Sequence, residues 1–210
     1  MASKNKSDNM NLTLGSLRKE IFFSDDWQQV KTMPEDPPGS VVIGKVTKFS
    51  HCIVLFYPIS ESDEMPFENP QFVIDGIHNC LSDNQGLIEV NSDRQDKTKI
   101  YSIVKTKMEP SGVQYCLTFH FRILDEFYCV TGFFSENGIT GEREATAFEL
   151  ACRDEIIKEN MIGWGRDPYD RNFTKGFLMN LSEDEKFDKM FPFHALSETR
   201  RFINKLMEQI

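Results

Sequence analysis

The stretch from Val113 to Phe121, "VQYCLTFHF", decides the fold class because its apolar residues recur at every second position. The alternation sets five apolar residues against four that are polar or small: Val113, Tyr115, Leu117, Phe119 and Phe121 against Gln114, Cys116, Thr118 and His120. A period of two is that of a β-strand, whose successive side chains point to opposite faces of a sheet. The stretch therefore predicts a strand with one face on a core and the other face half polar.

Three neighbouring segments have the same character and extend this strand into a sheet. "GLIEVNSD" and "KIYSIVKTK" precede it at residues 86–93 and 99–107, and "EFYCVTGFFSE" follows it at 126–136. Only short turn clusters separate them, and short connections join antiparallel neighbours. Two β-branched runs upstream, Val41–Val46 and Cys52–Tyr57, predict further strands. The predicted fold class is α+β: an antiparallel sheet of about six strands in a meander with helices packed on it, an α/β sandwich.

Helical patterns lie on both sides of the meander. Gln71–Leu81 predicts a helix that ends in a turn. After the meander, apolar residues recur at helical spacing over one long segment: Ala147, Leu150, Ala151, Ile157 and Met161. "SEDE" at Ser182–Glu185 has the form of a capping box that begins a short helix, and Leu196–Ile210 predicts an amphipathic helix.

The length and composition favour one domain with a substantial core. The chain has 210 residues, 40% of them apolar, including 18 phenylalanines, which suits one ordinary domain better than two large ones. We expect residues 1–12 to form a flexible N-terminal tail and residues 13–210 to form a single α+β domain. Within that domain, we expect residues 162–210 to be a C-terminal helical extension docked on the sheet.

The charge and the cysteines restrict the partners and the compartment. A net charge of −9 opposes nucleic acid or an anionic membrane as the main partner, because both would be repelled. An unknown protein partner fits better, and a basic one would be attracted by this charge. The five cysteines form no C-x-x-C pair, and we expect reduced thiols and a cytoplasmic protein. No signal peptide or membrane-spanning apolar run is seen.

The segment Trp164–Phe173, "WGRDPYDRNF", is the most suggestive candidate site. A calcium loop needs acids at alternating positions, but Asp167 and Asp170 are three residues apart with Pro168 between them. Carboxylate pairs for glycosidic chemistry are common by chance in a chain with 33 acids. A turn fixed by Pro168 and capped by Asp167 is the simplest interpretation.

Recognition of a partner is the functional interpretation of this segment, because Trp, Tyr and Arg are enriched at binding hot spots. The candidate recognition surface comprises six residues: Arg143, Trp164, Arg166, Asp167, Tyr169 and Asp170.

Two other motifs predict no chemistry of their own. "GITG" at residues 138–141 can present amides to an anion, but Glu142 and Glu144 would repel it, so a strand-to-helix connection is favoured. Three histidines and three cysteines are of the residue types that form zinc or thiol-nucleophile sites: His51, His78, His120, Cys52, Cys80 and Cys116. Their spacing, however, matches no zinc-finger or zinc-ribbon motif. We therefore expect no catalytic residue, no cofactor and no metal.

The meander from Gly86 to Phe134, followed by "GITGERE" at Gly138–Glu144, resembles the α/β sandwich superfamily of the PsbP extrinsic subunit and a Ran-binding nuclear import factor. The resemblance covers about half of the chain and concerns the fold. The segment from Asp167 to Phe202 also resembles part of a family of uncharacterised bacterial proteins. Members of the superfamily mostly act as binding or assembly proteins, so the resemblance implies a partner-binding role by fold analogy.

Two functional hypotheses follow. The first is a non-catalytic, cytosolic protein-interaction module of a bacterium: an adaptor, an accessory subunit or an immunity-type protein. The alternative is a small-ligand-binding protein or enzyme, with a pocket between the sheet and the C-terminal helices closed by Trp164 and Tyr169.

Overall fold

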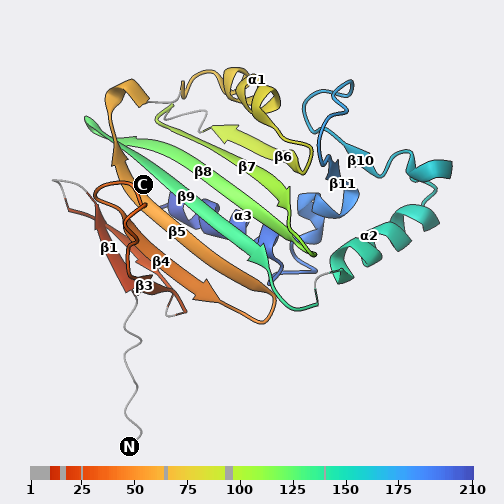
Figure 1. Ribbon diagram of the computed structural model, residues 1–210, viewed down its shortest axis with the longest axis horizontal. Coiled ribbons are helices and arrows are strands. Elements are labelled where there is room, and N and C mark those ends of the chain that lie inside the picture. The colour runs from red at the N-terminus through yellow and green to blue at the C-terminus, as the bar shows by residue number, and fades with distance from the viewer. Residues whose placement is uncertain (1–9, 15–17, 25, 64–65, 93–96, 140) are drawn as a thin grey trace, which may run out of the picture.

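A seven-stranded antiparallel sheet forms the centre of the computed structural model, which describes residues 10–14, 18–24, 26–63, 66–92, 97–139 and 141–210. From one edge to the other, the strands are β3 (Gln28–Val30), β4 (Val41–Val46), β5 (Ser50–Ile59), β9 (Glu126–Glu136), β8 (Val113–Ile123), β7 (Lys99–Lys107) and β6 (Gln85–Ser92). Figure 1 shows this twisted sheet. The predicted α+β class is confirmed, as is the meander from β6 to β9.

One face of the sheet carries the main core. Helix α3 (Ala195–Met207) packs there against β5, β8 and β9, beside a hairpin of β1 (Met10–Leu14) and β2 (Lys19–Phe23). The apolar residues predicted to alternate along β8 point to this face, where Tyr115, Leu117, Phe119 and Phe121 are fully buried. The alternation thus results from burial under α3 and the hairpin.

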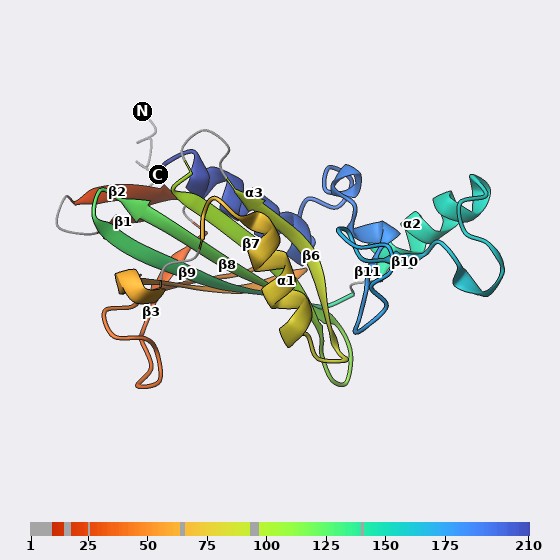
Figure 2. The same ribbon diagram turned by 90° about the horizontal axis from the view of Figure 1, so that it is seen from above.

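The opposite face is covered only in part. Helix α1 (Pro70–Cys80) lies over β6 and closes a smaller core that includes Val73, Ile74, Leu87 and Ile100 (Figure 2). Its beginning is set by Asn69, whose side chain accepts the Phe72 amide, with Pro70 in the first turn. Helix α1 also provides the connection from β5 to β6 across the sheet.

A lobe projects beyond the sheet, as Figures 1 and 2 both show. The α2 lobe, residues 141–193, contains α2 (Glu142–Arg153), η2 (Glu159–Met161), β10 (Gly165–Arg166), β11 (Met179–Asn180), η3 (Leu181–Glu183) and η4 (Glu185–Phe187). Within the lobe, α2 contacts η3, and β11 contacts β6 of the sheet. Within the described residues, no helix has the length and apolar character needed to span a bilayer.

Helix α2 ends at Arg153, so the longer helix predicted through Met161 is wrong. Glu155 adopts a left-handed conformation (φ 55°), and the amides of Glu155 and Ile156 bond back to the carbonyls of Cys152 and Ala151. These paired bonds are those of a Schellman motif, which ends a helix.

Two other boundaries also differ from the predictions. The capping box is formed by Asn180 and Glu183, two residues before the predicted "SEDE", because Glu183 accepts the Asn180 amide. Strand β1 begins at Met10, inside the predicted tail, because Leu12 and Leu14 are buried in the main core. Residues 1–9 of that predicted tail lie outside the described residues.

Candidate functional site

Asp167 closes the turn in "WGRDPYDRNF" and attaches it to helix α1. Its Oδ1 accepts the amides of Tyr169 (2.9 Å) and Asp170 (2.8 Å), and its Oδ2 lies 2.9 Å from Nε2 of His78. The His78 ring in turn stacks on Phe173, with the ring centroids 4.1 Å apart. Asp167 is buried, and its contacts are those of the turn that the sequence predicts.

Tyr169 attaches the same segment to the edge strand β6. Its hydroxyl accepts the Val90 amide (2.6 Å) and donates to the Val90 carbonyl (3.0 Å). An exposed sheet edge invites pairing with other chains, and here the hydroxyl occupies both backbone groups of Val90. Although Tyr169 is 42% exposed, its polar end is fully used within the chain.

The clasp is defined here as Asp167, Tyr169 and Asp170 with their contacts, and Trp164 and Arg166 lie apart from it. Trp164 meets Phe148 of α2 edge to face, with centroids 5.6 Å apart. Arg166 is exposed and pairs with Asp184 at 2.9 Å. Asp170 is exposed and accepts the Asn172 amide. Trp164 and Tyr169 thus lie against different elements and do not close one common pocket.

Arg143, the sixth residue of the predicted recognition surface, is buried. Helical spacing puts it on the same face of α2 as Ala147 and Ala151, and this face packs on η3. Its guanidinium donates to the Ser182 carbonyl (2.6 Å), to Oγ of Ser197 (2.7 Å) and to Asp188 (2.9 Å). Arg143 therefore joins α2 to the chain before α3 and to α3 itself.

A buried ion pair continues this polar network onto the sheet. Nζ of Lys105 on β7 lies 2.7 Å from Oε2 of Glu183, and both side chains are almost fully buried (0% and 1% exposed). The hydroxyl of Tyr115 donates to the other oxygen of Glu183 at 3.1 Å. This pair was not predicted from the sequence. Lys105 nevertheless stands two residues after Ile103 on the core face of β7, and a lysine at such a position indicates a buried partner.

The only group of potential metal ligands in the described part of the chain is Glu136, Glu144 and His194. Nδ1 of His194 accepts the Leu196 amide at 3.2 Å, so Nε2 carries the proton and donates to Glu136 at 2.9 Å. A metal needs a free lone pair on Nε2, which this tautomer lacks. Burial raises the pKa of Glu144 above its usual range. The arrangement fits a cap of helix α3 better than a metal centre.

The histidines and cysteines considered for zinc are distributed over several elements. Cys116 and His120 share one face of β8, as their spacing predicts, whereas Cys52 is buried in the core on the other face. His78 and Cys80 belong to α1. Nε2 of His120 lies 3.7 Å from Sγ of Cys129 on β9, and burial lowers the pKa of His120 to about 4. This histidine is therefore neutral at neutral pH.

Acidification from pH 7 to pH 4 is expected to destabilise the protein through His120 by at most about 3 kcal/mol. In the unfolded chain, an imidazole takes up a proton near pH 6.5, whereas the folded pKa is about 4. The unfolded state therefore binds more protons between these values, and stability falls as the pH decreases through them. Urea unfolding at several pH values should show this loss in the wild type and a smaller one in His120→Gln. His51→Gln, at an exposed position of β5, should behave like the wild type; equal pH dependence of all three proteins would contradict the prediction.

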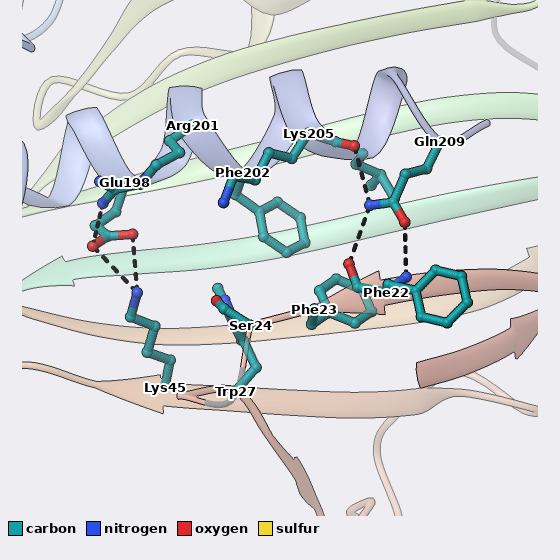
Figure 3. Close-up of a pocket in the computed structure, with 11 residues that line it drawn as sticks. Phe22, Phe23, Ser24, Trp27, Lys45, Glu198, Arg201, Phe202, Lys205 and Gln209 are labelled. Carbon is teal, nitrogen blue, oxygen red and sulfur yellow. Dashed lines mark hydrogen bonds and ion pairs between the residues drawn. The ribbon is translucent and has the colours of Figure 1, made fainter. Parts of the chain in front are cut away.

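One pocket lies between helix α3 and the β2–β3 region, and Figure 3 shows it. Its cavity volume is about 70 Å³, and its aromatic lining includes Phe23, Trp27 and Phe202. Three of the charged groups that line it are already paired: Lys45 contacts both Asp26 (2.6 Å) and Glu198 (3.4 Å), and Arg201 contacts Glu198. The pocket is small beside typical ligand pockets of about 300–1,000 Å³. It therefore offers little support for the small-ligand hypothesis.

Two larger apolar pockets adjoin on the α2 lobe, and Met190 lines both. The first, about 200 Å³, is also lined by Phe49, Ile139, Pro192 and Phe193. The second, about 260 Å³, lies between α2 and the η3–η4 segment. It is lined by residues of these elements and by Ile156, which follows α2: Ala147, Leu150, Ala151, Ile156, Leu181 and Phe187. No signal in the sequence pointed to these pockets, because their walls come from separate segments.

Comparison with known proteins gives structural similarity alone. No family model and no curated protein matches the sequence. Among solved structures, the chain is similar to the Saccharomyces cerevisiae Ran-binding protein Mog1p (TM-score 0.42, 13% identity, 68% of this chain and 83% of that chain) and, at the same score and identity, to a mutant of Mog1 (68% and 84%). It is also similar to cyanobacterial PsbP from Synechocystis (TM-score 0.41, 10% identity, 71% and 92%).

Proposed function

We propose that this protein is a non-catalytic protein-interaction module and that its recognition surface is the α2 lobe. The observation that carries the proposal is the pair of adjoining apolar pockets around Met190, surrounded by exposed apolar side chains. Of the fifteen large apolar residues that are exposed in the described part of the chain, seven belong to the α2 lobe, and an eighth, Ile139, lines the first pocket. The seven are Phe148, Ile156, Met161, Ile162, Tyr169, Met190 and Phe193. Such clustering is typical of interaction sites on soluble proteins.

The energy available from these side chains suits a protein partner. Fully burying one large apolar side chain contributes about 1.5–3 kcal/mol, and Ile139, Phe193 and Met190 are each more than half exposed. A partner that covered several of them would offset the entropy lost on association. Of the residues predicted for recognition, Trp164 and Arg166 belong to this surface in the proposal, whereas Asp167, Tyr169 and Asp170 act in the clasp.

The proposal treats residues 13–210 as one domain, with residues 162–210 docked on the sheet. Two contacts support the docking of residues 162–210 on the sheet: the buried pair of Lys105 and Glu183, and the pair of Arg200 of α3 with Glu89 of β6 at 3.0 Å. A rigidly held lobe suits recognition because little order has to be gained on binding.

Met190→Glu is expected to abolish partner binding without unfolding the protein. Met190 is 56% exposed, so glutamate fits there, but a charge between the two pockets would be desolvated by any apolar partner. The measurement is affinity capture from the native cell with quantitative mass spectrometry, alongside a thermal melt. The matched control is Met33→Glu, because Met33 is similarly exposed (59%) and lies outside the lobe.

We expect the amount of partner protein captured by Met190→Glu to be at least about tenfold lower than the amounts captured by the wild type and by Met33→Glu. Equal retention by both variants would contradict a role for the lobe. Failure of the wild type to retain any protein above a mock capture would contradict the interaction function itself.

A further inference from the structure

We propose, resting on the interaction function above, that the far end of the α2 lobe is an apolar tip that inserts into a cleft with a basic rim on the partner protein. The lobe tip is defined here as residues 154–163, the loop that follows α2. Figures 1 and 2 show this loop at the extreme end of the molecule, away from the sheet. A projecting loop suits insertion into a cleft, whereas the pockets beside it receive side chains from the partner.

Apolar side chains of the tip are presented to solvent. Ile156 is 47% exposed, Met161 48% and Ile162 62%. The backbone produces this presentation: Glu155, Asn160 and Met161 have φ values of 55°, 60° and 62°. A left-handed conformation is uncommon for residues other than glycine and marks strained, often functional segments.

Internal hydrogen bonds hold the tip in this shape. The Lys158 amide donates to the Ile162 carbonyl at 2.9 Å, and the Trp164 amide donates to the Met161 carbonyl at 3.0 Å. At the base of the tip, the Trp164 ring packs on Phe148, and the Leu181 amide donates to the Trp164 carbonyl at 3.0 Å. An ordered loop with exposed apolar side chains is prepared for binding, because its conformational entropy has already been lost.

The charge on and beside the tip determines which charge the rim of the partner's cleft should carry. Residues 148–163 contain four acids, Glu149, Asp154, Glu155 and Glu159, and two bases, Arg153 and Lys158, and all six are exposed. Arg153 is paired with Asp154 at 3.0 Å, which leaves an excess of negative charge. The whole chain also carries a net charge of −9. Like charges across an interface cost affinity and opposite charges steer association, so a basic rim fits this surface.

Site-specific photocrosslinking tests the tip separately from the pockets. A benzophenone amino acid would replace Ile162 in the tip, Phe193 beside the first pocket, or Phe22, an exposed aromatic outside the lobe (52% exposed). After irradiation of the native cell, we expect one protein to be crosslinked from Ile162 and Phe193 and not from Phe22. The crosslinked peptide from Ile162 should contain apolar residues flanked by lysine or arginine.

Each outcome separates the two proposals. Crosslinks from Phe193 without any from Ile162 would overturn the tip and leave the interaction function standing. A partner peptide from Ile162 that is neutral or acidic would overturn the basic rim. Absence of crosslinks from both positions would overturn the interaction function together with the tip.

A charge reversal provides the quantitative readout. Glu155→Lys with Glu159→Lys should lower the crosslink yield at Phe193 by at least about tenfold at physiological salt, and the deficit should shrink at high salt. Glu20→Lys with Glu61→Lys is the control, because it changes the net charge equally at exposed positions outside the lobe. Equal yields from the two double variants would contradict a role for the tip's charge.

Discussion

Replacing Glu183 with alanine is expected to destabilise the fold by about 3–5 kcal/mol. The change removes the carboxylate that pairs with Lys105 at 2.7 Å and leaves a fully buried ammonium group without its counterion. It also removes the acceptor for the Tyr115 hydroxyl and for the Asn180 amide. A buried charge that loses its partner costs far more than the pair itself contributes.

Urea unfolding provides the measurement, and pH distinguishes the cause. Burial lowers the pKa of Lys105, and Glu183 opposes this shift. In Glu183→Ala the folded-state pKa of Lys105 should decrease further, so the unfolded chain binds more protons and stability rises with pH. The deficit relative to wild type should therefore be smaller at pH 9.5 than at pH 7. A deficit below about 1 kcal/mol at pH 7 would contradict the prediction.

Two variants serve as controls for the charge argument. Glu68→Ala removes an exposed pair with Lys97, whose side chains are 72% and 59% exposed, and should change stability by less than about 1 kcal/mol. Lys105→Met combined with Glu183→Leu replaces both buried charges by apolar groups and should recover much of the lost stability. A double variant as unstable as Glu183→Ala would show that the charge was not the cause.

Gly86→Ala is the second large effect, with an expected loss of about 3 kcal/mol, at the upper end of what overpacking usually costs. A Cβ at Gly86 would lie 1.9 Å from the carbonyl oxygen of Phe177 and 2.8 Å from its carbonyl carbon, and both are backbone atoms. The segment must therefore move away from β6. This movement would break the hydrogen bond from the Phe177 amide to the Gln85 carbonyl (2.7 Å) and separate the Phe177 ring from Nζ of Lys105, now 3.8 Å apart.

Hydrogen exchange should locate this damage. We expect faster exchange across residues 176–183 than in the wild type, in addition to a lower melting temperature. Gly76→Ala is the matched control, because Gly76 lies in α1 and a Cβ there would meet nothing within 4 Å. Alanine in a helix interior should stabilise it by about 0.5–1 kcal/mol. Gly86→Ala as stable as the wild type would contradict the close packing of Phe177 on β6.

Local patterns in the sequence determined the sheet and most of the helices. The alternation along Val113–Phe121 and the short turns around it predict the meander correctly, because side-chain direction in a strand depends only on the residue's own position. The turn at Asp167 is predictable for a similar reason: its hydrogen bonds reach residues two and three positions away. The end of α2 was mispredicted, since Glu155 adopts a backbone conformation that its residue type does not announce.

Tertiary structure alone decided the candidate sites. Arg143 has a charged side chain and looks exposed in the sequence, yet the packing of α2 on η3 buries it beside Asp188. The pockets around Met190 and the pair of Lys105 with Glu183 join residues far apart in the chain. Sequence by itself determined which faces are apolar, because that is a property of neighbouring residues. Long-range packing decides which polar groups meet and which apolar side chains stay exposed. These features were therefore fixed only by the tertiary structure.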